Sequence, residues 1–230
     1  MTALIIYLVA IHNSPLKNKP LKIMLPNIDH FIFAAPTLES GMDAIENLLG
    51  IRPVVGGQHQ GRGTHNALLA MGNIYFEVIA PDPAQPDIPK PLWMKTDQVT
   101  QPQLWTWAAV NSDLFELEKI ANQNQISLGE IESGTRTQPN GNILEWQLTE
   151  PVLENENGIM PFFLNWGKTI HPSKTLPQAG EILAFKAIHP NPEFIKKQLG
   201  KLGVNLIVEK GIRPHLEATI KKTDGKIIQF

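Results

Sequence analysis

One glutamate in this chain of 230 residues stands where a charged group is costly. Glu77 lies inside the apolar run IYFEVIA, which is typical of a buried β-strand. A buried carboxylate without a partner destabilises a fold by roughly several kcal/mol. We therefore expect Glu77 to meet a metal ion, His30 or Arg62, and in a catalytic site it could move a proton.

Two arginines are further candidates for a site. Arg62 lies with His59 on the loop GGQHQGRG, where a cation could meet an anionic substrate, although a flexible surface loop is the alternative. Arg136 precedes the turn sequence PNG and could either bind a carboxylate or pair with Glu132 or Glu145. The glycine-rich loop is no phosphate loop, because it lacks the G-K-[ST] ending.

Aromatic side chains in the second half of the chain could line an apolar pocket. Trp146 and Phe163 are the candidates for substrate contact, and ordinary core packing is the alternative for each. His171, in the string WGKTIHPS, is a further candidate for substrate binding.

The composition excludes several classes of function. With 20 basic and 22 acidic residues and no basic run, the chain offers no clustered charge for nucleic acid. It contains no cysteine, so disulfides and cysteine-ligated metals are excluded. Any metal would take His, Asp, Glu, Asn or water, which favours a divalent zinc, nickel, iron or manganese ion. We expect the partner to be a small-molecule substrate or ligand.

The spacing of apolar residues changes repeatedly between period two and period 3.6, which indicates repeated strand and helix units. Residues 25–83 predict a strand, a helix ended by Gly50, and three strands, the last two joined at Gly72 and Asn73. Residues 103–168 repeat this order as a pattern rather than as identical residues. Residues 180–230 predict a shorter third unit with a hairpin at Asp224 and Gly225.

These units predict an α+β fold. A βαβββ unit covers one face of its sheet with its helix and leaves the other apolar face bare. We expect the two modules to pair into a curved mixed sheet around a cavity, as one domain over residues 25–172. The partial third β-α-β unit, residues 180–230, would pack on the same sheet. A ferredoxin-like sandwich is the rival, but there each helix would not be followed by several strands.

Residues 1–24 read as an N-terminal extension. Their apolar stretch MTALIIYLVAI is shorter than the about 20 residues that span a bilayer. It also lacks the basic start and cleavage site of a signal peptide. We interpret the residues before Met24 as a misassigned start or an extra edge strand. We expect a cytoplasmic protein without a membrane partner, and a homodimer is the assembly that we consider.

Several strings together resemble the glyoxalase-like branch of the vicinal oxygen chelate superfamily. They are IDHFIFAAPTLE, GGQHQGRGTHNALLAMGN and YFEVIAPDP, and later GTRTQPNGNILEW and MPFFLNWGKTIHPS. The resemblance implies paired βαβββ modules whose strands cup a divalent metal ion, with ligands from the first and last strands of a module. It implies that His30 and Glu77 are metal ligands, and His65, which begins the third strand, is the natural third ligand.

Strand parity leaves the place of His65 open. If the turn after its strand has two residues, Glu77 lies opposite Leu68, and Asn66 rather than His65 shares its face. If the turn has three residues, His65 shares that face. A bulge would also change the answer.

Three functions are compatible with these residues. The first is a metal-dependent lyase or isomerase in which the ion polarises an oxygen of a small oxygenated substrate. The second is a non-catalytic protein that sequesters a small ligand, and the third is an extradiol-type dioxygenase. The second module offers no ligand where His30 would align, which weakens the metal-dependent functions and the dioxygenase most.

Overall fold

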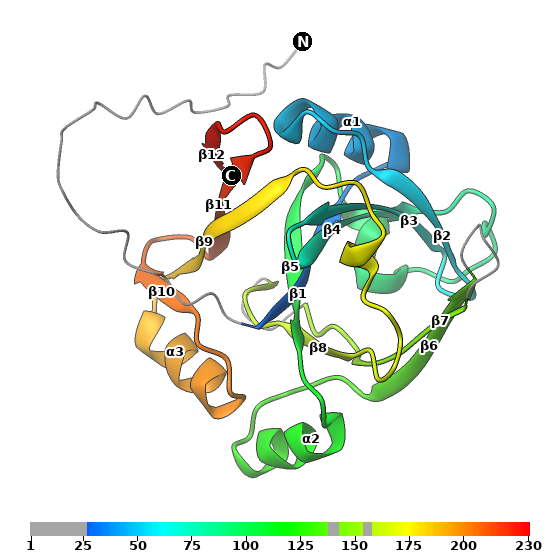
Figure 1. Ribbon diagram of the computed structural model, residues 1–230. Coiled ribbons are helices and arrows are strands. Elements are labelled where there is room, and N and C mark those ends of the chain that lie inside the picture. Colours follow the sequence, from blue (N-terminus) through cyan, green and yellow to red (C-terminus); the bar gives the residue numbers. More distant parts are fainter. Residues whose placement is uncertain (1–26, 138–142, 154–157) are drawn as a thin grey trace, which may run out of the picture.

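The chain forms two βαβββ modules and a smaller third unit (Figure 1). The computed structural model describes residues 27–137, 143–153 and 158–230. The first module consists of β1 (Ile28–Ala34), α1 (Leu38–Leu49), β2 (Val54–His59), β3 (Thr64–Met71) and β4 (Ile74–Pro81). The second consists of β5 (Gln103–Val110), α2 (Leu114–Gln123), β6 (Ile131–Thr137), β7 (Ile143–Thr149) and β8 (Phe162–Asn165). The third consists of β9 (Gly180–His189), α3 (Pro192–Lys201), β10 (Ile207–Lys210), β11 (His215–Lys222) and β12 (Ile227–Gln229).

The strands of both modules join in one sheet of eight strands, in the order β2-β3-β4-β1-β5-β8-β7-β6. The first strands of the modules, β1 and β5, pair antiparallel at the centre, and each runs parallel to the last strand of its own module. The edge strands β2 and β6 contact each other, so that the sheet curves into a nearly closed cup. The predicted α+β class and the paired βαβββ modules around a cavity are confirmed.

Local sequence signals set the helices. Thr37 caps α1 in a reciprocal capping box with Ser40, and Gly50 ends the helix with a φ of 83°, a left-handed conformation that glycine adopts without strain. Asp113 caps α2 by accepting a hydrogen bond from the Glu116 amide. Both helices lie on the outside of the sheet (Figure 1) and leave its concave face free.

Two strands differ from the predicted ranges. The pattern predicts β2 as a short strand over residues 52–55, but β2 continues to His59 through two glycines, with a register shift between Val55 and Gly57. The pattern also predicts a strand over residues 128–132, whereas β6 begins only at Ile131. The longer β2 makes His59 a strand residue, and this matters for the site.

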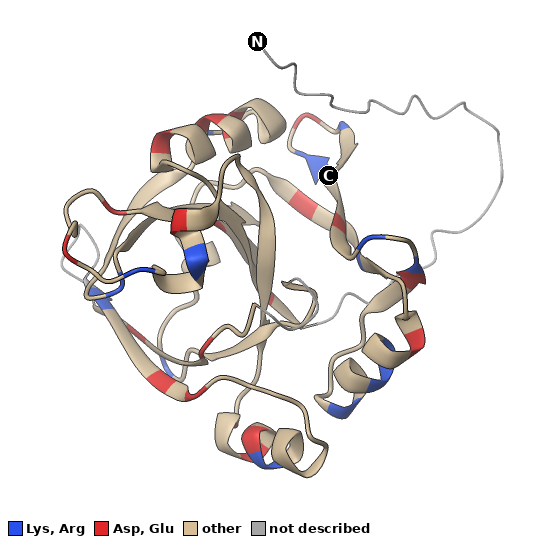
Figure 2. Cartoon of the chain, turned by 180° about the vertical axis from the view of Figure 1, so that it is seen from behind, with Lys and Arg blue, Asp and Glu red and all other residues tan. Residues whose placement is uncertain are grey.

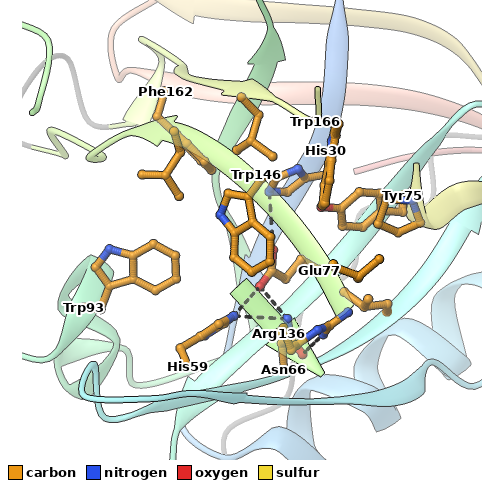
Figure 3. Close-up of a pocket in the computed structure, with 15 residues that line it drawn as sticks. His30, His59, Asn66, Tyr75, Glu77, Trp93, Arg136, Trp146, Phe162 and Trp166 are labelled. Atoms are coloured by element: carbon orange, nitrogen blue, oxygen red, sulfur yellow. Dashed lines mark hydrogen bonds and ion pairs between the residues drawn. The ribbon is translucent and has the colours of Figure 1, made fainter. Parts of the chain in front are cut away.

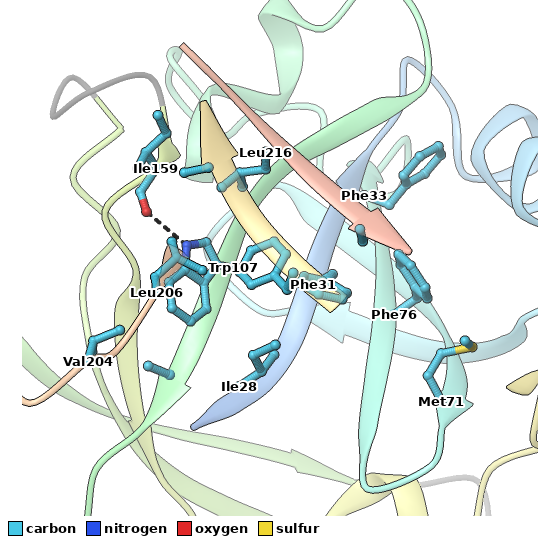
Figure 4. Packing of buried hydrophobic residues seen from close by; sticks show 14 of the residues in the cluster. Ile28, Phe31, Phe33, Met71, Phe76, Trp107, Ile159, Val204, Leu206 and Leu216 are labelled. Atoms are coloured by element: carbon cyan, nitrogen blue, oxygen red, sulfur yellow. Dashed lines mark hydrogen bonds between the residues drawn. The ribbon is translucent and has the colours of Figure 1, made fainter. Parts of the chain in front are cut away.

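The third unit forms a sheet of its own, in the order β10-β9-β11-β12, which packs on the convex side of the cup. Phe185 of β9 is buried with its ring 4.7 Å from the ring of Phe31 and 5.1 Å from that of Trp107. Figure 4 shows Leu206 and Leu216 of this unit gathered around the same tryptophan, whose indole donates to the Ile159 carbonyl. The outer face of β1 and β5 is thereby sealed from water.

Acidic and basic residues are mixed on α2 and α3, whereas α1 carries acidic residues only (Figure 2). None of the helices within the described ranges is long and apolar enough to cross a membrane. The predicted N-terminal extension, residues 1–24, and the predicted PNG turn lie outside the described residues.

We expect Phe185→Ala to lower the free energy of unfolding by about 3–5 kcal/mol, because it removes the ring that joins the third unit to the cup. Ile227→Ala is the matched control, since Ile227 is 60% exposed in the same sheet and should cost less than about 1 kcal/mol. Urea unfolding followed by tryptophan fluorescence measures both. Equal costs for the two variants would contradict this packing.

Candidate active site in the cup

The concave face of the sheet lines a cavity, shown in Figure 3. Its polar side chains come from the first module, except for one arginine of β6. The second module otherwise supplies apolar and aromatic groups. The lining residues are His30, His59, Asn66, Leu68, Tyr75 and Glu77 of the first module, Arg136, Leu144, Trp146, Leu148, Phe162, Leu164 and Trp166 of the second, and Trp93 and Pro172 of the connections.

Glu77 lies at the centre of the cup. Its strand pairs with β1 and β3 so that Glu77 aligns with Ile32 on one side and Leu68 on the other. The carboxylate is held between two imidazoles: Oε2 is 3.3 Å from His30 Nε2, and Oε1 is 3.4 Å from His59 Nε2. Asn66 donates its amide to Oε1 at 2.8 Å. The partner that a buried glutamate needs is therefore a group of three side chains.

These neighbours keep Glu77 ionised. Burial alone raises the pKa of a carboxyl group, but hydrogen bonds from His59 and Asn66 and the electrostatic attraction of His59 and His30 outweigh it and lower the pKa of Glu77 to about 2. At neutral pH the cup holds a buried negative charge that can accept a proton or a hydrogen bond.

A second carboxylate orients His30 from behind. The β1–β5 register shifts between Ile28 and His30, so Asp29 forms a bulge and its side chain meets that of its neighbour. Asp29 Oδ1 lies 2.7 Å from His30 Nδ1, and Oδ2 accepts the Trp166 indole N–H at 2.7 Å. Burial alone raises the pKa of Asp29, but hydrogen bonds and charge from His171 and His30 hold it well below its usual range.

Because an ionised carboxylate only accepts hydrogen bonds, the proton of His30 nearest Asp29 resides on Nδ1, and Nε2 faces Glu77. Tyr75 stacks on the ring of His30 at 4.5 Å and restricts its rotation. Burial and the charges of Asp29 and Glu77 raise the pKa of Tyr75 well above its usual value, so its hydroxyl stays protonated. Asp29 and Tyr75 together thus fix the orientation of the His30 imidazole.

The mouth of the cup is closed on one side by Arg62 and Trp93. Arg62 pairs with Glu132 of β6 and with Glu150, whose Oε1 is 2.7 Å from Arg62 Nη1. The guanidinium lies 4.6 Å from the centre of the Trp93 ring, and Trp93 donates its indole N–H to Glu150. The charge of Arg62 is therefore already matched by two carboxylates, which tie the loop 60–63 to the second module.

The structure does not bring His65 to the other two expected ligands. The turn between β3 and β4 has two residues. Leu68 therefore lies opposite Glu77, and Asn66 shares the face of Glu77, which is the alternative that strand parity gives for a two-residue turn. His65 points to the opposite side of the sheet, where its Nδ1 is 3.9 Å from Asp82 Oδ1. Burial lowers the pKa of His65 there, which favours its neutral form.

The other predicted residues divide between the cup and its surroundings. Trp146 lines the cavity as expected, but Phe163 is packed in the outer core, and its neighbour Phe162 faces the cavity instead. Side chains alternate along β8, and two adjacent phenylalanines give no sign of which of them faces inward. His171 lies behind the cup wall, with Nε2 3.5 Å from Asp29 Oδ2.

The donor set does not fit the metal site that the resemblance implies. His30 and His59 approach different oxygens of Glu77, and no three His, Asp or Glu side chains among the described residues are grouped so that they could hold a metal ion. A catalytic divalent ion such as zinc takes about three ligands from the protein. We therefore derive no chemical step through a metal ion.

Sequence reasoning missed most of the groups around Glu77. Strand parity places Asn66 on the face of Glu77 in only one of its two alternatives, and the sequence pattern predicts a loop, not a strand, at His59. The sequence signal for Asp29 is a charged residue inside the mostly apolar strand β1, but only the bulge turns it toward His30.

A cup built from two βαβββ modules, with its polar groups on the concave face, defines a domain of the vicinal oxygen chelate type. The family model described as a glyoxalase-like domain matches residues 28–203, and the chain belongs to this family.

The comparison with solved structures finds a similar fold in the first of the two proteins described next. The crystal structure of a hypothetical protein from Staphylococcus aureus is 16% identical, with a TM-score of 0.65, over 90% of this chain and 99% of that chain. Methylmalonyl-CoA epimerase from Mycobacterium tuberculosis is 15% identical, with a TM-score of 0.40, over 61% of this chain and 88% of that chain. No curated protein matches the chain.

We expect the stability of the protein to decrease as the pH is lowered, and part of this decrease to depend on Glu77. Its pKa is lowered from 4.5 to about 2 in the folded state, so the ionised form contributes stability above about pH 4.5 that is lost as the pH falls toward 2. In Glu77→Gln this part of the decline should be absent, while Asp29 still contributes to it. Urea unfolding across this pH range measures the difference. The control is Glu130→Gln, at an exposed glutamate, which should behave as the wild type; parallel curves for Glu77→Gln and wild type would contradict the assignment.

Divalent metal ions should not stabilise the protein. After treatment with a chelator, added zinc, nickel or manganese should leave the melting temperature unchanged, because a ligand stabilises only the state that binds it. A rise in melting temperature that saturates at one equivalent, and that is lost in His30→Ala but kept in His215→Ala, would show that the ligands rearrange to form a metal site.

Proposed function

We propose that this glyoxalase-like protein is a lyase or isomerase that moves a proton on a small oxygenated molecule. Glu77 would take the proton from a carbon atom next to an oxygen-bearing carbon, and His30 would return a proton to the substrate. The observation that carries this proposal is the pair of facing groups, Glu77 Oε2 and His30 Nε2, 3.3 Å apart in a buried cup. A reaction of this class needs one group that accepts a proton and one that donates it.

The ionised carboxylate of Glu77 and the two carboxylates around His30 support these roles. Glu77 is ionised and can receive a proton as the substrate C–H bond breaks. His30 is flanked by Glu77 and Asp29, so a charged imidazole would have a carboxylate on each side. Such a carboxylate behind an imidazole fixes its tautomer and stabilises the charge that it carries during proton transfer.

The walls of the cup support a small substrate. Trp146, Phe162 and Leu148 exclude water from one side of Glu77, which strengthens electrostatic interactions inside. The space left between the side chains is about 40 Å³, enough for one or a few water molecules. A carbonyl, hydroxyl or carboxylate group fits this space better than a large ring.

Proton transfer can be tested without knowledge of the natural substrate. Wild-type protein in D₂O should incorporate deuterium next to the oxygenated carbon of at least one member of a small panel: pyruvate, lactate, hydroxyacetone and dihydroxyacetone. We expect Glu77→Gln to exchange about 10²–10⁴-fold more slowly, since it removes the group that accepts the proton. Proton NMR follows the loss of the C–H signal.

Glu130→Gln is the control and should exchange as fast as the wild type. Binding of these molecules without any exchange would contradict the proposal and favour a sequestering protein instead. Equal exchange in the wild type and Glu77→Gln would assign the proton transfer to another group.

A further inference from the structure

The guanidinium of Arg136 lines the cup and forms no ion pair with any carboxylate of the described residues. It lies on β6 and reaches across the gap between the two edge strands, where its Nη1 donates to Asn66 Oδ1 at 2.9 Å. Asn66 in turn donates to Glu77, so one amide separates the guanidinium from the central carboxylate (Figure 3). The positive group therefore lies at the floor of the cavity, beside the proposed proton acceptor.

The two acids that could have paired with Arg136 are both engaged elsewhere or turned away. Glu132 binds Arg62 at the mouth of the cup. Glu145 pairs with Thr135 in the β6–β7 ladder and faces the other side of the sheet, while Arg136 pairs with Leu144 and faces inward. The Nε of Arg136 is buried and has no hydrogen-bond partner in the described part of the chain. A buried N–H without an acceptor is unusual and marks a place for one.

A glycine makes room for this arginine. A Cβ atom added to Gly56 would lie 2.4 Å from Arg136 Nη1 and 2.3 Å from Asn66 Oδ1, which is closer than atoms can approach. Gly56 does not have a positive φ, so its backbone does not require glycine. The space that Gly56 leaves is occupied by the contact between the arginine and the asparagine.

We propose that Arg136 binds the carboxylate of the substrate, which makes the substrate a short carboxylic acid whose oxygenated carbon faces Glu77 and His30. This inference rests on the proposed function for the role of Glu77, but not for the binding of the anion. A planar guanidinium with free N–H groups fits a carboxylate through two parallel hydrogen bonds. The carboxylate would occupy the acceptor position that Nε lacks, and the small space beside it limits the length of the acid.

Calorimetric titration of the protein with acids and with their neutral amides tests this proposal. Lactate, pyruvate and 3-hydroxybutyrate are the probes, and lactamide, pyruvamide and 3-hydroxybutyramide are their matches in size. We expect at least one acid to bind with a millimolar dissociation constant, and its amide to bind about tenfold more weakly or not at all. No binding of any acid, or equal binding of acid and amide, would overturn the proposal.

Variants separate anion binding from the other roles of the residues. Arg136→Met should weaken acid binding by about tenfold or more, and Arg136→Lys should recover part of it, because charge remains without the planar fork. Gly56→Ala, which displaces the same guanidinium without removing it, should also weaken binding. Arg213→Met, at an exposed arginine of the third unit, is the control for loss of charge and should bind as the wild type.

A direct readout guards against a variant that does not fold. In wild-type protein the Arg136 Nε–H resonance should shift on addition of the acid that binds and not with its amide. If this resonance does not move while the acid binds, the carboxylate lies elsewhere and the proposal is wrong. Glu77→Gln should still bind the acid, so exchange and binding are separate readouts. Loss of exchange with retained binding concerns the proton transfer by Glu77 alone, and loss of binding with retained exchange concerns the role of Arg136 alone.

Discussion

The buried charge of Glu77 is the constraint on which the rest of the cup depends. An ionised carboxylate at the centre of a sheet is tolerated only if other groups replace the water that it has lost. Here two imidazoles and an amide do so, and each is positioned by a further group: His30 by Asp29, His59 by Thr64, and Asn66 by Arg136. The polar groups of the cup form one connected network, which contains both carboxylates and the arginine.

The fold explains why this network is one-sided. The two modules are equivalent in topology, and a family of this type could place ligands on both. In this chain the inward positions of β7 and β8 are Leu144, Trp146, Leu148, Phe162 and Leu164. The second module therefore acts as an apolar wall, and Arg136 is its one charged contribution among the described lining residues. Such a division suits proton transfer to and from a small polar group held against a dry surface.

Much of the architecture could be predicted from the sequence, because helix caps, the period of apolar residues and the turn residues Gly72 and Asn73 act locally, although the length of that turn stayed open. The central placement of His30 and Glu77 followed from the same patterns together with the resemblance. What could not be predicted depends on single-residue shifts. The bulge turns Asp29 toward His30, and the extension of β2 brings His59 to the cup. The adjacent phenylalanines of β8 do not indicate whether Phe162 or Phe163 faces inward. A register error of one residue exchanges the two faces of a strand. The prediction of site residues is therefore more sensitive to such an error than the prediction of the fold.

The most direct test of this account is the ionisation of the Glu77 side chain itself. A ¹³C NMR titration of its carboxyl carbon, assigned by its disappearance in Glu77→Gln, reports the protonation of this one group. The account predicts a carboxylate that stays ionised through pH 4.5 and titrates near 2. A midpoint at or above the ordinary value of 4.5 would show that the imidazoles and Asn66 do not hold the charge, and the network described here would then be wrong.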